Sequence, residues 1–250
     1  MFFSPRWGLH GNKFIPFEKE KWNFFLEHFK SKETILSKFK YFPNHTKYFG
    51  IEKNSYDGNL YLSAMSYLCN LAITNRIYLG SIVKSFFNKK LNIKDFSLVW
   101  DCVHDSIKEE KIKNSSRIIH RHGAAPTYDQ EYIKKNLNNN LNYRHVIIPS
   151  KPGGETLLAF SKKNVKNFFH SICHGTGRLL DRPMARKKFS HKLTKKEISK
   201  KINKLYYKMD DLSGENPKSF RSINQVIKIL EKRNLIKKLY LTKPLYILKS

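Results

Sequence analysis

One histidine lies in a run of small residues that is followed by regularly spaced arginines. Residues 169–189 read FHSICHGTGRLLDRPMARKKF, where His174 stands between Cys173 and the glycines at 175 and 177. Glycine leaves backbone N–H groups open to a bulky group, as phosphate-binding loops require. A neutral imidazole nitrogen can attack a phosphorus atom or bind a metal. The segment therefore predicts a site that handles phosphate.

Three arginines follow at intervals of four residues, namely Arg178, Arg182 and Arg186. In a helix this spacing aligns the three guanidinium groups on one face, where they would meet phosphate oxygens. The alternative interpretation is a turn followed by a basic helix that faces water. The spacing alone leaves both interpretations open.

A second group of metal-ligating residue types lies in LVWDCVHDSIKEEK, at 98–111. The run begins as an apolar, strand-like segment and ends in polar residues. Carboxylates, thiolates and imidazoles hold transition metals, so four neighbours could ligate one together: Asp101, Cys102, His104 and Asp105. The alternative interpretation is a structural histidine at the end of a strand, beside residues that cap it.

The spacing of apolar residues predicts the helices that must position these groups. A long, largely buried helix is predicted over 58–88 from apolar residues at helical spacing: Leu60, Ala64, Leu68, Leu71 and Ile77. Another helix is predicted over 18–31. Thr194 and Glu197 have the spacing of a capping box and predict a helix start. The segment 222–238 predicts a further amphipathic helix.

Short runs of β-branched or apolar residues between glycine, proline and asparagine predict strands at 116–126, 145–150 and 155–161. Residues 138–142 read NNNLN and predict a loop. The closing run 239–250 reads as one strand, and Pro244 indicates that this strand lies at a sheet edge. No internal repeat separates parts of the chain. The mixture of elements predicts one α+β domain with mixed sheets and packed helices.

The charge of the chain indicates a polyanionic partner. The 250 residues carry a formal net charge of +28, from 48 Lys and Arg against 20 Asp and Glu. Such an excess repels itself unless polyanions are near, and nucleic acid is the commonest such partner. The alternative explanation is an AT-rich coding bias, since Asn, Lys, Ile and Phe are all abundant. That bias does not explain where the arginines fall.

The cysteines and the apolar runs bear on the compartment. Cys69, Cys102 and Cys173 form no C-x-x-C pair and predict no disulfide framework. No run of eighteen apolar residues is present, and the first residues lack the order of a signal peptide. We therefore expect a cytoplasmic protein of a reducing compartment.

Several segments, in the same order, resemble the RtcB-type RNA ligase family. The run HGTGR…DR is similar to the family's H-G-A-G-R…S-R, and SRIIHRHGAAP to its H-R-K-G-A/S-T segment. HVIIPSKPGGETLLAF resembles V-L-I-P-G-S-M-G-T-A-S-Y, and DGNLYLSAMSYLCNLAITNR resembles G-x-x-Y-L-x-A-M…A-x-x-N-R. TKPLYILKS is similar to the closing R-P-x-x-V-I-K-G. The resemblance covers 51–250 clearly and 1–50 weakly.

The resemblance implies a role for each matching residue. His174 occupies the position of the nucleophile that takes GMP from GTP, and His104 that of a manganese ligand. Asp105 replaces a nucleotide-contacting asparagine. Lys249 occupies the position of the lysine that contacts guanine, and Phe220 that of an aromatic residue that stacks on guanine. The resemblance also implies nucleotide contacts from Lys151, Thr156, Thr176 and Gly177, and RNA phosphate contacts from Arg178 and Arg182.

The departures from the family lie in its metal-binding half. The chain has no D-x-x-C-G segment, whose Asp and Cys bind manganese in the family. FFSPRWGLHGNKF, at 2–14, resembles a degraded H-S-G-S-R-G-L-G region, or a G-N-H-F region with Lys13 at the histidine position. His10 is the remaining candidate ligand there. The chain thus corresponds to the C-terminal, nucleotide-carrying half of the family's domain, truncated at its N-terminus.

The implied activity is an RNA ligase that joins a 3′-phosphate or 2′,3′-cyclic phosphate to a 5′-hydroxyl, with GTP and Mn(II) as cofactors. RNA repair and tRNA splicing are the processes that the family serves. Two alternatives remain open: a catalytically impaired paralogue that binds RNA or GTP, and one half of a split ligase. In the second, a separate polypeptide supplies the metal-binding half.

Overall fold

A computed structural model describes residues 52–250 except Phe96, 113–114, 138–140, Lys201, 208–210 and Ser250. Within its helices and strands it describes only the backbone of residues 57, 64, 67, 68, 71, 141, 142, 248 and 249. The helix predicted over 18–31 and the candidate residues His10 and Lys13 lie outside the described part. The prediction of a separate segment over 1–50 therefore stays a prediction.

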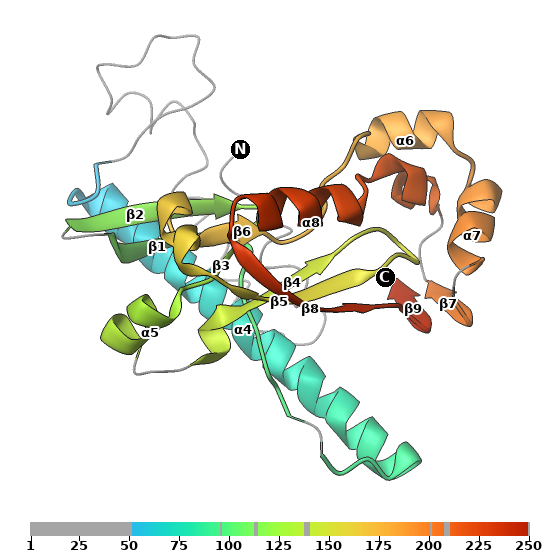
Figure 1. Cartoon of the computed structure of the whole chain (residues 1–250), viewed down its shortest axis with the longest axis horizontal. Helices are drawn as coiled ribbons and strands as arrows, with labels where there is room; N and C mark the ends of the chain where they lie inside the picture. Colours follow the sequence, from blue (N-terminus) through green and yellow to red (C-terminus); the bar gives the residue numbers. More distant parts are fainter. Residues whose placement is uncertain are drawn as a thin grey trace. The chain divides into compact units, whose positions relative to one another are not determined.

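Helices and strands are mixed along the chain, which confirms the α+β prediction (Figure 1). The chain divides into two compact units, and the division lies between His120 and Arg121. We call these the first unit and the second unit. The segment His174–Arg182 belongs to the second unit, and His104 belongs to the first.

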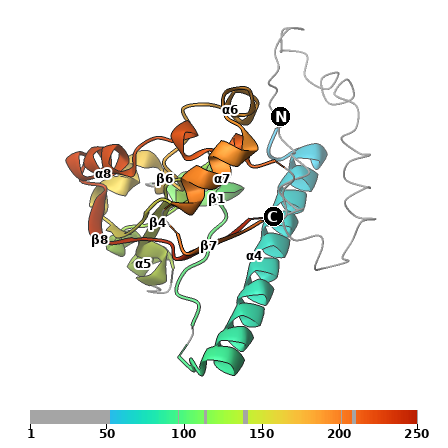
Figure 2. The ribbon, with the colours of Figure 1, turned by 90° about the vertical axis from the view of Figure 1, so that its right-hand side faces the viewer.

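One long helix, α4 (Tyr56–Leu91), accounts for much of the first unit (Figure 2). It begins at Ser55, whose hydroxyl accepts a hydrogen bond from the Gly58 N–H at 3.0 Å. It ends at Asn92, which has a left-handed φ of 52°. These caps satisfy backbone groups that the helix ends leave open. The helix predicted over 58–88 is confirmed.

The expectation that this helix is largely buried is wrong for its C-terminal half. Met65 and Asn75 are buried, whereas six later apolar residues are more than two-fifths exposed: Ile77, Tyr78, Ile82, Val83, Phe86 and Leu91. A helix of 36 residues is about 54 Å long. Of the strands that the structure describes, β1 (Asp105–Ile112) packs against it, and an eight-residue strand is too short to cover it.

The first unit continues with a hairpin of β1 and β2 (Ser115–His122). The apolar residues before β1 do not form the expected strand, because 97–104 have no regular structure apart from a bend at His104. The strand begins only at Asp105, where alternation of buried and exposed side chains starts. Polar residues with period-two burial, rather than the apolar run, therefore mark this strand.

The core of the second unit is an antiparallel sheet in the order β4 (His145–Pro149), β5 (Thr156–Ser161) and β8 (Ile236–Thr242). Alternate residues of β4 and β5 are buried, and α8 (Ile223–Lys232) packs on β8 through its apolar face. The buried side chains are Val146, Ile148, Leu157, Ala159, Ile227, Leu230 and Ile236. The predicted strands at 116–126, 145–150 and 155–161 and the amphipathic helix are confirmed.

Two smaller sheets complete the second unit. In one, β3 (Ala124–Pro126) runs antiparallel to β6 (Ser171–Cys173). In the other, β7 (Lys204–Tyr207) runs parallel to β9 (Tyr246–Lys249). The helices between these strands are α5 (Gln130–Asn136), α6 (Arg182–Lys188) and α7 (His191–Ser199), with 3₁₀ turns η1 (Leu141–Arg144), η2 (Lys163–Phe168), η3 (Ser213–Glu215) and η4 (Pro217–Ser219).

The end of the chain differs from its prediction as one strand over 239–250. It forms β8 and β9, which pair with different partners on either side of Pro244. Proline has no N–H to donate and a fixed φ, so the ladder stops there. The helix predicted over 222–238 likewise stops at Lys232, because Asn234 takes a left-handed φ of 54° and β8 begins. Of the loop predicted at 138–142, residues 141–142 belong to η1 and the rest lie outside the description.

The predicted helix start at Thr194 is wrong. Helix α7 begins after Ser190, whose hydroxyl accepts from the Leu193 N–H at 3.2 Å. Thr194 lies inside the helix with no exposed surface, and its hydroxyl accepts from the side chain of buried Asn216 at 2.9 Å. A contact between residues 22 positions apart decides the position of Thr194, whereas the capping-box pattern is local.

No helix in the described part of the chain is long and apolar enough to cross a membrane.

The Thr194–Asn216 pair predicts a stability effect. Thr194→Val keeps the volume but removes the acceptor, so the buried Asn216 amide loses its partner. We expect the free energy of unfolding to fall by about 1–3 kcal/mol, measured by urea titration followed by circular dichroism. The control is Thr242→Val, whose exposed hydroxyl bonds to the Thr156 carbonyl at 3.3 Å and should change stability by less than about 0.5 kcal/mol. Equal effects of the two variants would contradict the prediction.

Candidate nucleotide and phosphate site

His174 follows directly after β6 and is held by the short β3–β6 ladder. In that ladder Ala124 lies opposite Cys173, and the next N–H, that of His174, donates to the Gly123 carbonyl at 3.3 Å. Gly123 has a φ of +66°, which side chains rarely allow. A Cβ at that position would lie 3.9 Å from the His174 ring. The backbone of His174 is therefore fixed at the end of a strand.

The residues after His174 join two other segments of the second unit. Thr176 is buried, and its hydroxyl donates to the Ser150 carbonyl at 3.4 Å. Gly177 has a φ of +76°, and its carbonyl accepts from the Arg221 N–H at 3.1 Å. The predicted loop residues Thr176 and Gly177 thus connect His174 to the β4–β5 turn and to the start of α8.

A cavity of about 530 Å³ lies between those two segments. Its lining includes three cationic side chains and the glycines of the β4–β5 turn: Lys151, Arg221, Lys243, Gly153 and Gly154. The Ser150 hydroxyl in this lining is buried and has no hydrogen-bond partner among the described residues. Cavities of this size hold nucleotide-sized ligands. Cations and an unpaired hydroxyl suit a polyphosphate.

Glycine is required at one position of the cavity wall. Gly154 donates its N–H to the Lys151 carbonyl at 2.7 Å, in a tight turn. A Cβ on Gly154 would collide with the Ser150 hydroxyl and lie 2.7 Å from the Lys151 side chain. The turn therefore brings Ser150 and Lys151 close to its backbone. This places Lys151, predicted to contact the nucleotide, in the cavity wall.

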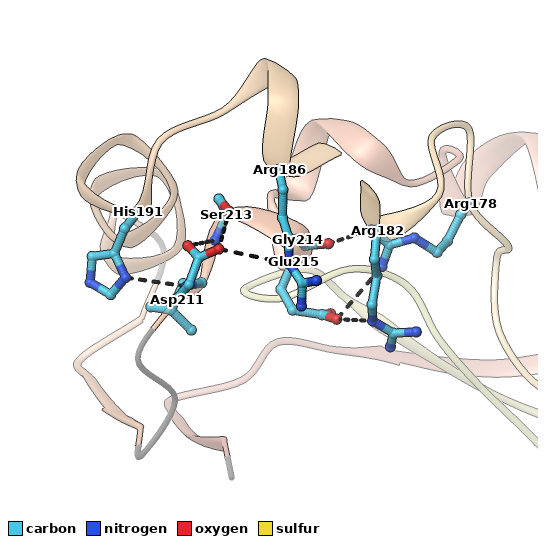
Figure 3. A network of polar contacts seen from close by, with 9 residues as sticks. Arg178, Arg182, Arg186, His191, Asp211, Ser213, Gly214 and Glu215 are labelled. Carbon is cyan, nitrogen blue, oxygen red and sulfur yellow. Dashed lines mark hydrogen bonds and ion pairs between the residues drawn. The ribbon is translucent and has the colours of Figure 1, made fainter. Parts of the chain in front are cut away.

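The arginines after the loop contact protein oxygens (Figure 3). Arg178 donates to the Leu180 carbonyl at 2.9 Å and to the Gly214 carbonyl, and its Nη1 lies 3.7 Å from Glu215 Oε1. Arg182 donates to the same Glu215 oxygen at 2.8 Å. Arg186 lies 3.7 Å from an Asp211 carboxylate oxygen. The three groups lie side by side, each against an acidic or carbonyl partner.

Neither sequence interpretation of these arginines is fully correct. Helix α6 begins at Arg182, so Arg178 precedes the helix and the three do not share a helix face. Arg178 and Arg182 nevertheless meet at one carboxylate, because α6 packs against η3, which carries Glu215. Burial lowers the pKa of Arg178 and the nearby Glu215 carboxylate raises it. A guanidinium stays charged at neutral pH in either case.

Phe220 lies beneath Arg178, whose guanidinium carbon is 4.4 Å from the ring centroid. The two residues also pair as an isolated antiparallel bridge. One face of the Phe220 ring is therefore covered by a cation. Stacking of guanine on Phe220, as predicted, would use the other face.

The remaining predicted nucleotide residues lie at strand ends. Thr156 begins β5, opposite Pro149, and its carbonyl accepts from Thr242 at 3.3 Å. Lys249 ends β9 opposite Tyr207, and the structure describes only its backbone. The second unit thus carries all the predicted site residues except His104 and Asp105.

His104 and Asp105 lie in the first unit, with His104 Nδ1 3.1 Å from an Asp105 carboxylate oxygen. Their neighbours in sequence are occupied differently. Asp101 accepts from Arg76 through both oxygens, one of them at 2.8 Å from Nη2. Burial, followed by the Asp101 charge, raises the pKa of Cys102 to about 12. The role of His104 as a manganese ligand stays a prediction.

The side chains present do not form a manganese site by themselves. Among the described residues, no three His, Cys, Asp or Glu side chains are grouped to hold a metal ion. The possible ligand set of Asp101, Cys102, His104 and Asp105 is therefore not assembled. Asp101 instead forms a bidentate ion pair with Arg76, the geometry that a guanidinium prefers.

Sequence reasoning missed two residues of this site. Arg221 lines the cavity and binds the Gly177 carbonyl, and Glu215 joins Arg178 to Arg182. In a chain with 48 Lys and Arg, one more arginine before a helix gives little signal. Glu215 had a signal, because it is one of few acidic residues in the stretch that follows the arginines.

The shared carboxylate predicts a measurable effect. Glu215→Gln keeps the size but removes the charge between Arg178 and Arg182. We expect the free energy of unfolding to fall by about 2–4 kcal/mol, less than for a fully enclosed pair because Arg182 is half exposed. Urea unfolding measures it. The control Glu131→Gln breaks an exposed 3.6 Å pair with Lys163 and should change little. A neutral Glu215→Gln result would show that Glu215 does not stabilise this cluster.

Comparisons with known proteins agree with the geometry. The family model described as "tRNA-splicing ligase RtcB" matches residues 25–250. The chain is 25% identical over 219 residues to "RNA-splicing ligase RtcB homolog 1" of Entamoeba dispar, covering 80% of this chain and 39% of that protein. It is 24% identical over 209 residues to "tRNA-splicing ligase RtcB" of Archaeoglobus fulgidus, covering 79% of this chain and 43% of that protein.

A third relative, "tRNA-splicing ligase RtcB" of Pyrococcus abyssi, is 26% identical over 215 residues, which are 78% of this chain and 22% of that protein. The chain therefore spans less than half the length of these relatives. Because the family model extends over most of the sequence, from residue 25 to residue 250, the chain belongs to the RtcB family.

Proposed function

We propose that this chain takes part in RNA ligation, joining an RNA 3′-phosphate or 2′,3′-cyclic phosphate to a 5′-hydroxyl through a GMP–histidine intermediate. The observation that carries the proposal is the position of His174. It stands at the end of β6, and its loop is hydrogen-bonded to both walls of the cationic cavity. The names of the relatives, RNA-splicing and tRNA-splicing ligase, support the same reaction class.

In the proposed first step, a nitrogen of His174 attacks the α-phosphorus of GTP. The new N–P bond replaces the bond to the bridging oxygen, and pyrophosphate leaves with that electron pair. The GMP group then passes to the RNA 3′-phosphate and frees His174. Attack of the 5′-hydroxyl on that activated phosphate forms the RNA bond and releases GMP.

The residues around His174 suit the charges of this sequence. Lys151, Arg221 and Lys243 line the cavity and would neutralise the triphosphate as charge moves to pyrophosphate. Thr176 and Gly177 hold the loop rigid, which places the nucleophile before the nucleotide arrives. In this proposal Phe220, Thr156, Asp105 and Lys249 contribute the remaining contacts to the guanosine.

Arg178 and Arg182 are proposed to receive the RNA phosphate. Both guanidinium groups are already oriented by Glu215, and Arg178 Nη1 is buried without a hydrogen bond in the described part of the chain. A phosphate oxygen could satisfy that donor after a small shift. An arginine pair favours phosphate because its paired N–H groups match two oxygens.

Manganese, which the family implies, requires ligands beyond those described. One imidazole, that of His104, does not hold Mn(II) tightly, because this ion prefers several oxygen and nitrogen ligands together. The chain also spans less than half of its relatives. Both observations favour the split-ligase alternative, in which a separate polypeptide supplies metal ligands. A catalytically impaired paralogue that binds RNA or GTP is the other candidate.

We also propose a cytoplasmic location. The three cysteines are free thiols in the structure, which suits a reducing compartment. GTP and RNA ends are both present there.

Labelled GTP tests the intermediate. Incubation of the full chain with α-labelled GTP and Mn(II) should give a protein–GMP adduct that is labile in acid and stable in base, as a histidine phosphoramidate is. His174→Ala should abolish the label without changing the circular dichroism spectrum. The exposed residue His122 provides the control variant His122→Ala, which should keep it. Label retained by His174→Ala would assign the nucleophile elsewhere.

The missing ligands give a second prediction. The chain alone should bind Mn(II) weakly without GTP, as measured by calorimetry, and should ligate RNA poorly. Adding a polypeptide that carries D-x-x-C-G and G-N-H segments should restore ligation if the enzyme is split. Tight, stoichiometric Mn(II) binding by the chain alone would contradict this, and Asp101→Asn, Cys102→Ser and His10→Ala would then locate the ligands.

A further inference from the structure

A second cavity, of about 640 Å³, lies at the other end of the central sheet. Its walls come from the start of α5, the residue before β4, the end of β5 and the turn before β8. These elements lie together at one end of the sheet in Figure 1. Four cations and two carboxylates line it: Lys134, Arg144, Lys162, Lys163, Asp129 and Glu131. Nothing in the proposed chemistry of His174 uses these side chains.

Arg144 is the fixed element of this cavity. Its Nη2 donates to the Ser161 carbonyl at 3.3 Å, and its guanidinium carbon lies 5.3 Å from the centroid of the Phe160 ring. Its Nε is buried and has no hydrogen-bond partner among the described residues. An arginine held from two sides with donors to spare is oriented for an anionic ligand.

The other charges leave the cavity positive. Lys163 lies 3.6 Å from Glu131, but both side chains are mostly exposed, so water weakens that pair. The Lys162 ammonium donates to a neutral group, the Asn234 side chain, at 2.8 Å. Asp129 is buried and accepts from the Tyr132 N–H as the cap of α5. The cations therefore outnumber the carboxylates, and one carboxylate is occupied by the helix end.

Helix α8 connects the two cavities. Ser222, Ile223 and Asn224 at its start line the first cavity, and Asn234, just past its end, lines the second. Ten helical residues span about 15 Å, and β5, with six residues, spans about 20 Å. Lys228 and Lys232 of α8 are exposed between the two ends. A stacked nucleic-acid strand, at about 3.4 Å per nucleotide, covers this distance in about five nucleotides.

We propose that the Arg144 cavity binds a backbone phosphate of the RNA, about five nucleotides from the end that is joined. This inference rests on the proposed ligase function, because it takes the second cavity as an extension of the same substrate path. RNA fits better than an acidic protein, since phosphates recur at regular spacing and match the guanidinium fork. The site would position the strand without reading its sequence.

The test compares charge removal at this cavity with charge removal elsewhere. Lys134→Gln with Lys163→Gln removes two cavity cations, and Lys84→Gln with Lys89→Gln removes two exposed cations of α4. Binding of single-stranded RNAs of about twelve and about three nucleotides, each with a 3′-phosphate, is measured by fluorescence anisotropy over a range of salt concentrations. The labelled-GTP adduct is measured for every variant.

We expect the cavity double variant to bind the long RNA at least tenfold more weakly. The slope of log K against log salt should fall by about 1.4, at about 0.7 per lost phosphate contact on a single strand. The short RNA should bind as it does to the unmodified chain, because it does not reach the cavity. The adduct should form normally, and the α4 double variant should keep most of its affinity for the long RNA.

Several outcomes would overturn the inference. They are an equal loss for both double variants, a loss that includes the short RNA, or competition by polyglutamate as strong as by RNA of equal charge. Arg144→Lys separates geometry from charge and should weaken long-RNA binding several-fold; if it unfolds, the double variants decide. Failure of the adduct in the unmodified chain, with the length-dependent RNA effect intact, would contradict the proposed function but not this site.

Discussion

The arrangement of the second unit depends on one buried carboxylate, that of Glu215. It lies between Arg178, from the loop after His174, and Arg182, at the start of α6. The next residue, Asn216, is bound to Thr194 inside α7. Two neighbouring side chains of one turn thus join the nucleophile loop to two helices. Such a pair costs desolvation and adds little net stability, so its main effect is to select one arrangement.

This constraint holds the nucleophile loop at its far end, and a different one holds its near end. At His174, the β3–β6 ladder and the Gly123 carbonyl fix the backbone. At Arg178, the Glu215 contact and the Phe220 ring fix the side chain. A loop anchored at both ends loses little entropy when a nucleotide binds. The two glycines with positive φ, Gly123 and Gly177, allow the sharp changes of direction that this needs.

Local patterns predicted the parts of the fold that local patterns control. The strands at 145–150 and 155–161 and helix α8 follow from burial with a period of two or of 3.6, and His174 was found from its flanking glycines. The failures involve distant partners or their lack. Thr194 is placed by Asn216, the break at Pro244 follows from pairing with two different strands, and the exposed end of α4 lies beyond its packing partner. Arg221 could not be distinguished among so many cations.

The two units differ in what their polar side chains are free to do. In the second unit, the cations beside the β4–β5 turn line an open cavity, and the Ser150 hydroxyl there has no hydrogen-bond partner among the described residues. In the first unit, the potential metal ligands already have other roles: Asp101 binds Arg76, Asp105 lies against His104, and burial keeps the Cys102 thiol protonated. A nucleotide can therefore enter the second unit without breaking an ion pair, whereas a metal ion would have to displace Arg76 from Asp101. This difference favours a division of labour in which the described chain handles nucleotide and phosphate, and the metal ligands come from outside its described residues.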